Sequence, residues 1–223
     1  MNSISRLLAF MISSPGFAAT EVRGRVFYDK LDPHSPSFFF QSTTSEKPDG
    51  SRIVVNRYTD KSGKELILEE SEIRNNRLVR YSYKQQQVSD FGDATLNSNG
   101  IEMSFTEEGV TETEKEKPED NLIVAPMITP LLSEKWASLM EDEEIKVRYL
   151  AIERLDTIGF KFFKDKERML NGKAVVDIKM KPSSIFIAAL VSPIRITVTR
   201  DAPHHLVESQ GRTPIRWPVR NPP

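Results

Sequence analysis

Several clusters of polar side chains have residue types that could do chemistry. His204 and His205 precede Glu208 in a segment patterned like a strand, and these are residue types that zinc sites use. Neighbouring residues on a strand point to opposite faces, so the two imidazoles cannot bind one ion together. His34, the remaining histidine, is remote in the sequence. We therefore expect neither a metal site nor a cofactor.

The other polar clusters do not make an active site. Residues 97–100, Asn-Ser-Asn-Gly, resemble part of a calcium loop, but Thr95 and Thr106 stand where that loop needs carboxylates. A hairpin turn explains them. The acidic run at residues 69–72 could supply a general acid and base, although solvated strand edges are the simpler explanation. With no cysteine and no nucleophile motif, we predict that the chain is not an enzyme.

The apolar segment Ser183–Ser192 is the clearest candidate for binding. Pro182 and Pro193 bracket it, and seven consecutive apolar residues begin at Ile185. As a helix it would be apolar on all sides, so it must be covered or must lie against something apolar. Ten helical residues span about 15 Å, which is half a bilayer core. The segment is therefore either a buried strand or core helix, or a lid over an apolar cavity.

Two further segments can line such a cavity. A helix is expected over Ile128–Met140, where apolar residues recur at helical spacing and Pro130 suits the first turn. A strand is expected over Gly159–Phe163. The predicted ligand-binding residues are Trp136, Phe160, Phe162, Ile185, Phe186, Ala189 and Leu190.

Short strands separated by turn signals make up most of the remaining chain. Between Glu21 and Lys117, period-two stretches alternate with turns such as Asp49-Gly50 and Asn75-Asn76, a pattern that predicts an antiparallel meander. An exposed loop is expected over Glu112–Asp120. More strands are expected later, with Asn171-Gly172 as one hairpin turn, at residues 144–154, 173–180, 194–199 and 205–209.

The first nineteen residues have the layout of a secretory signal peptide. Arg6 supplies a positive charge, Leu7–Ile12 is an apolar run, and small residues surround a cut after Ala18. The run is far shorter than the roughly 20 residues of a spanning helix, and Pro15-Gly16 would be unusual inside a buried helix. We predict cleavage near Ala18, and no cysteine follows that could carry a lipid anchor.

Composition limits the setting and the partners. The mature chain of 205 residues can bury a core, and a secreted chain without cysteine is typical of the bacterial periplasm. Net charge is near zero, which argues against nucleic acid. After Phe160, however, the sequence has twelve Lys and Arg residues and only five Asp and Glu residues. This basic third of the chain could attract an anionic membrane surface, or its charges could lie on solvated strand faces.

Part of the C-terminal half is similar to a family of uncharacterised secreted bacterial proteins. The residues that carry the resemblance are Val147–Phe160, Met180–Ser184 and Gly211–Pro214. More loosely, the layout resembles the half-barrels of periplasmic lipoprotein carriers. That resemblance implies a curved antiparallel sheet around plugging helices, with acyl chains bound between them. It transfers no individual binding residue.

We therefore expect a mainly β (α+β) protein, an open antiparallel half-barrel with two short helices on its concave face. Residues 1–18 are the predicted signal peptide, 19–211 one domain, and 212–223 an extended tail rich in Arg and Pro. The predicted function is periplasmic binding or carriage of a lipid or other apolar ligand, without a transmembrane segment in the mature chain. The alternative is a structural or interaction protein with a partner in the bacterial envelope.

Overall fold

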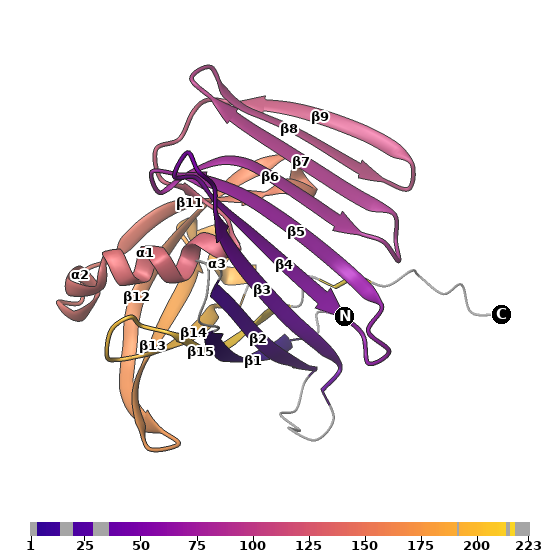
Figure 1. Cartoon of the computed structure of the whole chain (residues 1–223). Helices are drawn as coiled ribbons and strands as arrows, with labels where there is room; N and C mark the ends of the chain where they lie inside the picture. The colour runs from indigo at the N-terminus through magenta and orange to yellow at the C-terminus, as the bar shows by residue number, and fades with distance from the viewer. Residues whose placement is uncertain (1–3, 14–19, 29–35, 191, 213–214, 217–223) are drawn as a thin grey trace.

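One sheet of fifteen strands dominates the computed structural model, which describes residues 4–13, 20–28, 36–190, 192–212 and 215–216. The strand order is β10-β11-β12-β13-β14-β15-β1-β2-β3-β4-β5-β6-β7-β8-β9 (Figure 1). Neighbouring strands run antiparallel, except that β10 and β11 are parallel. The expected mainly β class and curved half-barrel are confirmed.

The strands and helices divide the chain as follows. The first half contributes β1 Ile4–Ser13, β2 Thr20–Tyr28, β3 Phe38–Glu46, β4 Arg52–Thr59, β5 Glu65–Arg74, β6 Arg77–Gln85, β7 Asp90–Asn97, β8 Gly100–Glu107 and β9 Val110–Glu116. The second half contributes β10 Leu122–Ile123, β11 Ile145–Ala151, β12 Asp156–Leu170, β13 Lys173–Pro182, β14 Ile194–Thr199 and β15 Leu206–Arg212. The helices are η1 Ala125–Met127, α1 Ile128–Glu134, α2 Trp136–Met140, η2 Ile152–Arg154 and α3 Ile185–Leu190.

Turn residues set the hairpins where the sequence predicted them. Asn75 and Asn76 join β5 to β6 with φ values of 50° and 58°. Asn171 and Gly172 join β12 to β13 with φ values of 49° and 77°. Two consecutive residues with positive φ form the tight turn whose twist matches that of paired strands, and Asn and Gly adopt it most readily.

The C-terminal segment shows how strongly the sheet curls. Strand β15 ends at Arg212, and Arg216 already contacts β7 and β8. Along the sheet, β15 and β6 are six strand spacings apart, roughly 29 Å at about 4.8 Å per spacing. Four residues of chain span at most about 14 Å. The sheet must therefore bend back on itself so that β15 ends near β6.

The two ends of the sheet meet through side chains rather than a backbone ladder. The carboxylate of Glu116 on β9 accepts hydrogen bonds from the backbone N–H of Thr157 at 3.1 Å and from its hydroxyl at 2.6 Å. Helix η2 packs against β7 and β8. A Cβ at Gly92 would lie 2.7 Å from Cγ1 of Ile152, so this close approach requires glycine.

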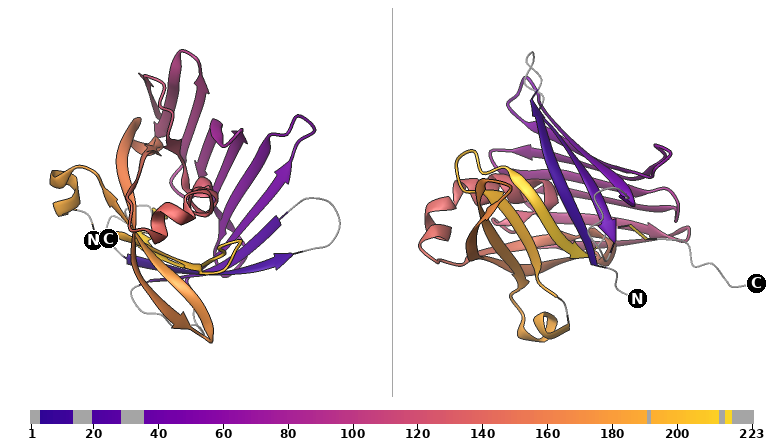
Figure 2. Two further views of the ribbon diagram at one scale, coloured as in Figure 1. Left: turned by 90° about the vertical axis from the view of Figure 1, so that its left-hand side faces the viewer. Right: turned by 90° about the horizontal axis from the view of Figure 1, so that it is seen from below.

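Helices α1 and α2 occupy the expected region, and α1 lies inside the curl (Figure 2). Leu132 and Leu139 are fully buried there. The sequence predicted one continuous helix, and this is corrected to two. The backbone of Lys135 leaves helical geometry at φ −96° and ψ 19°, which ends the first helix and begins the second.

Helix α3 forms where the sequence predicted one, but not on the concave face. It protrudes from the outside of the sheet between β13 and β14 (Figure 2). Ile185 and Phe186 are 83% and 86% exposed. The expectation that this helix covers an apolar cavity is therefore wrong. The short links from Pro182 and to Ile194 hold it at the ends of its two strands, away from the interior.

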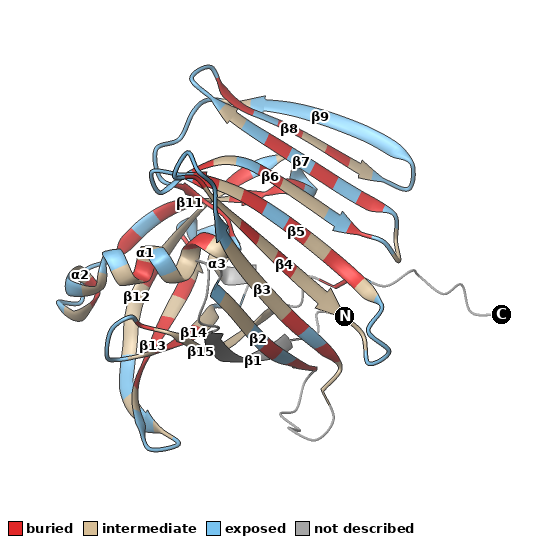
Figure 3. Cartoon of the chain, in the orientation of Figure 1, coloured by how far each residue is buried: buried red, intermediate tan, exposed pale blue. Residues whose placement is uncertain are grey.

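The expected loop at residues 112–120 is also corrected, because β9 continues to Glu116. This strand lies at the edge of the sheet and is exposed along nearly its whole length (Figure 3). Polar and charged residues therefore occupy both of its faces. Such an edge strand lacks the apolar alternation by which strands are recognised in a sequence.

The backbone of Ile4–Ser13 forms β1, which pairs with both β2 and β15. These residues belong to the predicted signal peptide, whose proposed cut at Ala18 lies outside the described residues. In the full-length chain the segment is thus a strand of the sheet. Cleavage at the proposed site would remove that strand from the sheet.

Candidate functional site

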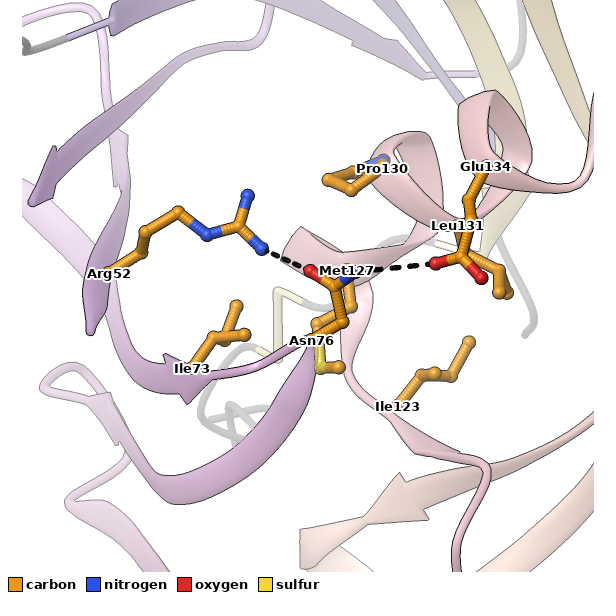
Figure 4. A pocket seen from close by; sticks show the side chains of 8 residues that line it. All are labelled: Arg52, Ile73, Asn76, Ile123, Met127, Pro130, Leu131 and Glu134. Carbon is orange, nitrogen blue, oxygen red and sulfur yellow. Dashed lines mark hydrogen bonds between the residues drawn. The ribbon is translucent and has the colours of Figure 1, made fainter. Parts of the chain in front are cut away.

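A small pocket lies where helix α1 faces the ends of β4 and β5 (Figure 4). Its cavity volume is about 50 Å³. Apolar side chains from four elements form much of the lining, namely Ile73, Ile123, Met127, Pro130 and Leu131. The pocket is therefore a hollow with apolar walls at the seam between the sheet and the internal helix.

Three polar side chains complete the lining of this pocket. Nη2 of Arg52 donates to Oδ1 of Asn76 at 2.9 Å, and Nδ2 of Asn76 lies 3.4 Å from Oε2 of Glu134. Lys135 neutralises Glu134 at 2.9 Å. Arg52 has no carboxylate partner among the described residues. The pocket thus combines apolar walls with a guanidinium, Arg52, that can pair with an anionic group, and with a carboxylate, Glu134, that is paired with Lys135.

A second polar group lies on the inner surface of the sheet. Glu69 on β5 is 8% exposed. The hydroxyl of Tyr81 donates to its Oε1 at 2.8 Å, and Nδ2 of Asn56 donates to its Oε2 at 3.1 Å. Burial raises the pKa of Glu69, and these two hydrogen bonds partly oppose the shift. The acidic run at residues 69–72 was predicted to be a solvated edge, and this is wrong for Glu69.

Tyrosines surround Glu69 and are themselves shifted. Tyr83 lies opposite Glu69 in the β5–β6 register. Burial, followed by the charge of Glu69, raises the pKa of Tyr58, Tyr81, Tyr83 and Tyr149. These phenols therefore stay neutral and act as hydrogen-bonding groups.

Two buried oxygens near Glu69 have unused hydrogen-bonding capacity. Oδ1 of Asn56 and Oγ of Ser71 have no hydrogen-bond partner among the described protein atoms. Buried polar atoms of this kind usually bind water or a small polar group. The interior of the curl is thus polar in part, whereas the seven residues predicted to bind a ligand are all apolar.

The described residues among these seven lie partly in the core and partly in solvent. Trp136 on α2 stacks on His204 with ring centroids 3.8 Å apart. Phe160 meets Tyr149 edge to face at 5.9 Å, while Phe162 is fully buried in the core. None of the five whose side chains the structure describes lines this pocket.

Ile185 and Phe186, the predicted α3 residues whose side chains the structure describes, lie apart from that pocket. Ile185 and Phe186 point into solvent, so their predicted role in lining a cavity is corrected. The side chains of Ala189 and Leu190 lie outside the described residues. The apolar run was correctly identified as a distinct feature, but composition cannot tell an apolar helix that is buried from one that is exposed.

Arg52, Asn76 and Glu134 were not identified from the sequence. Asn75-Asn76 was recognised only as a turn, and Arg52 begins a strand in which it resembles any other outer residue. The pairing of β4 with β5 and the position of α1 bring the three together. The sequence could reveal these three residues as a site only through knowledge of which segments, about 25 to 80 residues apart, are in contact.

The described residues contain neither a metal-binding cluster nor a helix that could span a membrane. No group of three or more His, Asp or Glu side chains in this part of the chain could hold a metal ion. In the same residues, no helix combines the length and apolar character needed to cross a bilayer.

Comparisons with known proteins give structural similarity without sequence similarity. No family model matches the chain, and no curated protein matches its sequence. A solved structure, described as a β-barrel-like protein of the domain of unknown function DUF1849 from Brucella abortus, is similar with a TM-score of 0.42. Identity is 7%, with 98% of each chain covered. The neighbour is a bacterial protein of unknown function, and no site residue is transferred from it.

Proposed function

We propose that this protein is a non-catalytic binding or carrier protein of the bacterial periplasm, and that it holds a lipid or another ligand with an apolar part. The observation that carries the proposal is the pocket at the seam of α1 and β4–β5. Its apolar walls can take an acyl or similar chain, and Arg52 at its side can pair with an anionic head.

The size of the pocket limits what it can enclose. The cavity volume is only about 50 Å³, so the pocket can hold a short apolar group or the end of a longer chain. The remainder of a long lipid would lie outside, along the exposed surface of the helix. We therefore expect single-chain anionic amphiphiles to bind more tightly than diacyl lipids.

Variants of the pocket test this function directly. We expect octanoate to bind more tightly than octylamine, and Arg52→Glu to weaken octanoate binding by about tenfold because it replaces attraction with repulsion. Leu131→Trp should reduce the binding of both ligands by filling the hollow. Isothermal titration calorimetry on the purified protein gives the dissociation constants.

The matched control is Arg80→Glu, a charge reversal of an exposed arginine on β6 that pairs with Asp93 outside the pocket. It should leave octanoate binding unchanged. Equal binding of octanoate by the Arg52→Glu and Arg80→Glu proteins would contradict the site. Absence of binding to any apolar ligand would contradict the function itself.

The compartment is tested by the mass of the processed chain. We expect the protein, expressed with its own N-terminus in a bacterium with a periplasm, to lose residues 1–18. Cleavage would take β1 from between β2 and β15. Both strands are antiparallel to β1 and therefore parallel to each other, so they can pair after closing by about 4.8 Å. Intact mass showing residues 1–18 retained would contradict export and leave the segment as β1.

A structural or interaction role in the envelope is the second candidate. The exposed apolar side chains of α3 favour it, because monomeric proteins rarely expose large apolar side chains together without a partner. This role and ligand binding involve different surfaces of the molecule, so they are tested separately.

A further inference from the structure

Helix α3 presents apolar side chains that the rest of the protein leaves uncovered. Ile185 and Phe186 are 83% and 86% exposed, and Ile187 is 36% exposed. The helix emerges between the ends of β13 and β14, and Figure 2 shows it outside the sheet in both views. Three adjacent large apolar residues form a compact tip that projects away from the sheet.

The root of this tip is anchored rather than loose. The backbone N–H of Ser183 donates to the carbonyl oxygen of Gly159 at 2.8 Å, which ties the start of the excursion to β12. The N–H of Ala188 donates to the carbonyl oxygen of Ser184 at 2.9 Å, which closes the first helical turn. Ile185 and Phe186 are thus exposed by the fold itself.

The strand ends beside α3 carry an excess of positive charge. Lys161 and Lys181 lie opposite each other in register, and so do Lys179 and Arg195. Among the described residues, two carboxylates pair with three of these four cations. Glu144 pairs with Lys161 at 2.7 Å, and Asp165 lies 2.5 Å from Lys179 and 3.6 Å from Arg195.

Lys181 is the cation nearest to the tip in sequence. Among the described residues it has no carboxylate partner, and its ammonium group lies 5.1 Å from the ring centroid of Phe163. This cation–π contact places no negative charge beside the ammonium group of Lys181. The tip therefore has apolar side chains at its end and uncompensated positive charge at its root.

We propose that α3 docks this protein onto the surface of an anionic lipid bilayer. Ile185 and Phe186 would enter the boundary between headgroups and acyl chains, and Lys181 with its cationic neighbours would contact the phosphates. Apolar side chains inserted beside basic residues are the combination by which peripheral proteins bind anionic membranes. The positive charge of these residues favours a lipid surface over an apolar protein surface, because lipid phosphates attract cations and an apolar protein surface does not.

The proposal rests on α3 and its neighbours and not on the pocket. It can hold whether or not the pocket binds a ligand. If both hold, membrane docking would bring the protein to the place from which a lipid could be taken up. Neither result depends on the other experiment.

Vesicle co-sedimentation of the full-length chain tests the docking. We expect binding to vesicles of phosphatidylglycerol and phosphatidylcholine, weak binding to phosphatidylcholine alone, and loss of binding at high salt. The double variant Ile185→Ser with Phe186→Ser should reduce the partition coefficient at least tenfold. Lys181→Glu should reduce it several-fold, and only with the anionic vesicles.

The control is Val110→Ser with Met169→Ser, which removes two apolar side chains that are 65% and 66% exposed on other hairpins. This variant should bind vesicles as the parent does. Circular dichroism checks that all variants fold, which is expected because every replaced side chain except Lys181 is largely exposed.

Four outcomes would overturn the proposal, and the first three concern vesicle binding. They are no binding to anionic vesicles, equal binding by the α3 double variant and the control, and equal binding to neutral and anionic vesicles. Self-association that disappears in the α3 variant, without vesicle binding, would assign the tip to a protein contact and would also overturn it.

Discussion

Replacement of Ile215 by alanine is expected to lower the free energy of unfolding by about 3 kcal/mol. Ile215 is 5% exposed and packs in a cluster with side chains of β2, β3 and β5. Its removal leaves a cavity between the C-terminal segment and the sheet, which costs both the transfer of the side chain and the lost contacts. Urea denaturation followed by tryptophan fluorescence measures the change.

The matched control is the same substitution at Ile185, which is 83% exposed. Ile185→Ala should change the free energy of unfolding by less than about 0.5 kcal/mol. Equal effects of the two substitutions would show that residue 215 does not pack against the sheet. The clustering of Val26, Phe38 and Phe40 around it would then need another explanation.

Arg216 adds a second contact of the same segment. Its guanidinium lies 2.9 Å from Oδ2 of Asp90, which is 1% exposed, and also contacts Glu107. Its backbone carbonyl accepts hydrogen bonds from the side-chain amides of Gln85 and Gln87 at 2.9 Å each. Deletion of the predicted tail, residues 212–223, would therefore destabilise the sheet, so a loss of partners after that deletion would not identify a docking site.

The second large effect is expected at Glu69. Glu69→Leu should lower the free energy of unfolding by about 2 kcal/mol, because the hydroxyl of Tyr81 and the amide of Asn56 lose their acceptor in the interior. Glu69→Gln keeps an acceptor oxygen for one of them, and its amide can donate to Asn56 after the asparagine side chain flips. This variant should be more stable than the parent by on the order of 1 kcal/mol at pH 7.

The pH dependence distinguishes a buried charge from lost packing. Burial raises the pKa of Glu69 above its ordinary value of 4.5, so the folded state binds a proton more tightly than the unfolded state. The parent is therefore expected to lose stability as pH rises from about 4.5 through the raised pKa. Glu69→Gln has no titrating group there, so its advantage should grow over the same interval.

The control for this titration is Glu70→Gln, which alters the adjacent and exposed residue of the same strand. It should follow the parent at every pH between 4 and 8. Identical pH profiles for Glu69→Gln and the parent would contradict the burial of an ionisable group at Glu69. Thermal unfolding at intervals of half a pH unit is sufficient.

Local features of the chain were predictable because they depend on neighbouring residues. The hairpins at Asn75-Asn76 and Asn171-Gly172 follow from which residues adopt positive φ, and the helices follow from periodicity and proline. The fold class follows from many short alternating strands. Strand β9 was partly missed because both faces of an edge strand are solvated, and the helix at Ile128–Met140 was predicted without its break.

The candidate site was not predictable in the same way. Arg52, Asn76 and Glu134 are ordinary polar residues until the curl of the sheet brings α1 against β4 and β5. Glu69 looks like part of a solvated run, and only the side of the sheet to which it points makes it buried. For an isolated strand of this kind, period-two patterning names two faces but does not say which of them becomes the interior.

Local patterns in the chain were thus sufficient to predict a mainly β protein, an apolar segment at residues 183–192 and a basic C-terminal third. Tertiary structure decided that this segment stands outside the sheet, that Ile215 and Arg216 cross to the opposite strands, and that a carboxyl group lies in the interior. The physical reason is that turns and periodicity are fixed by contacts over a few residues. Burial depends instead on how fifteen strands curl, and that is settled by contacts across the whole chain.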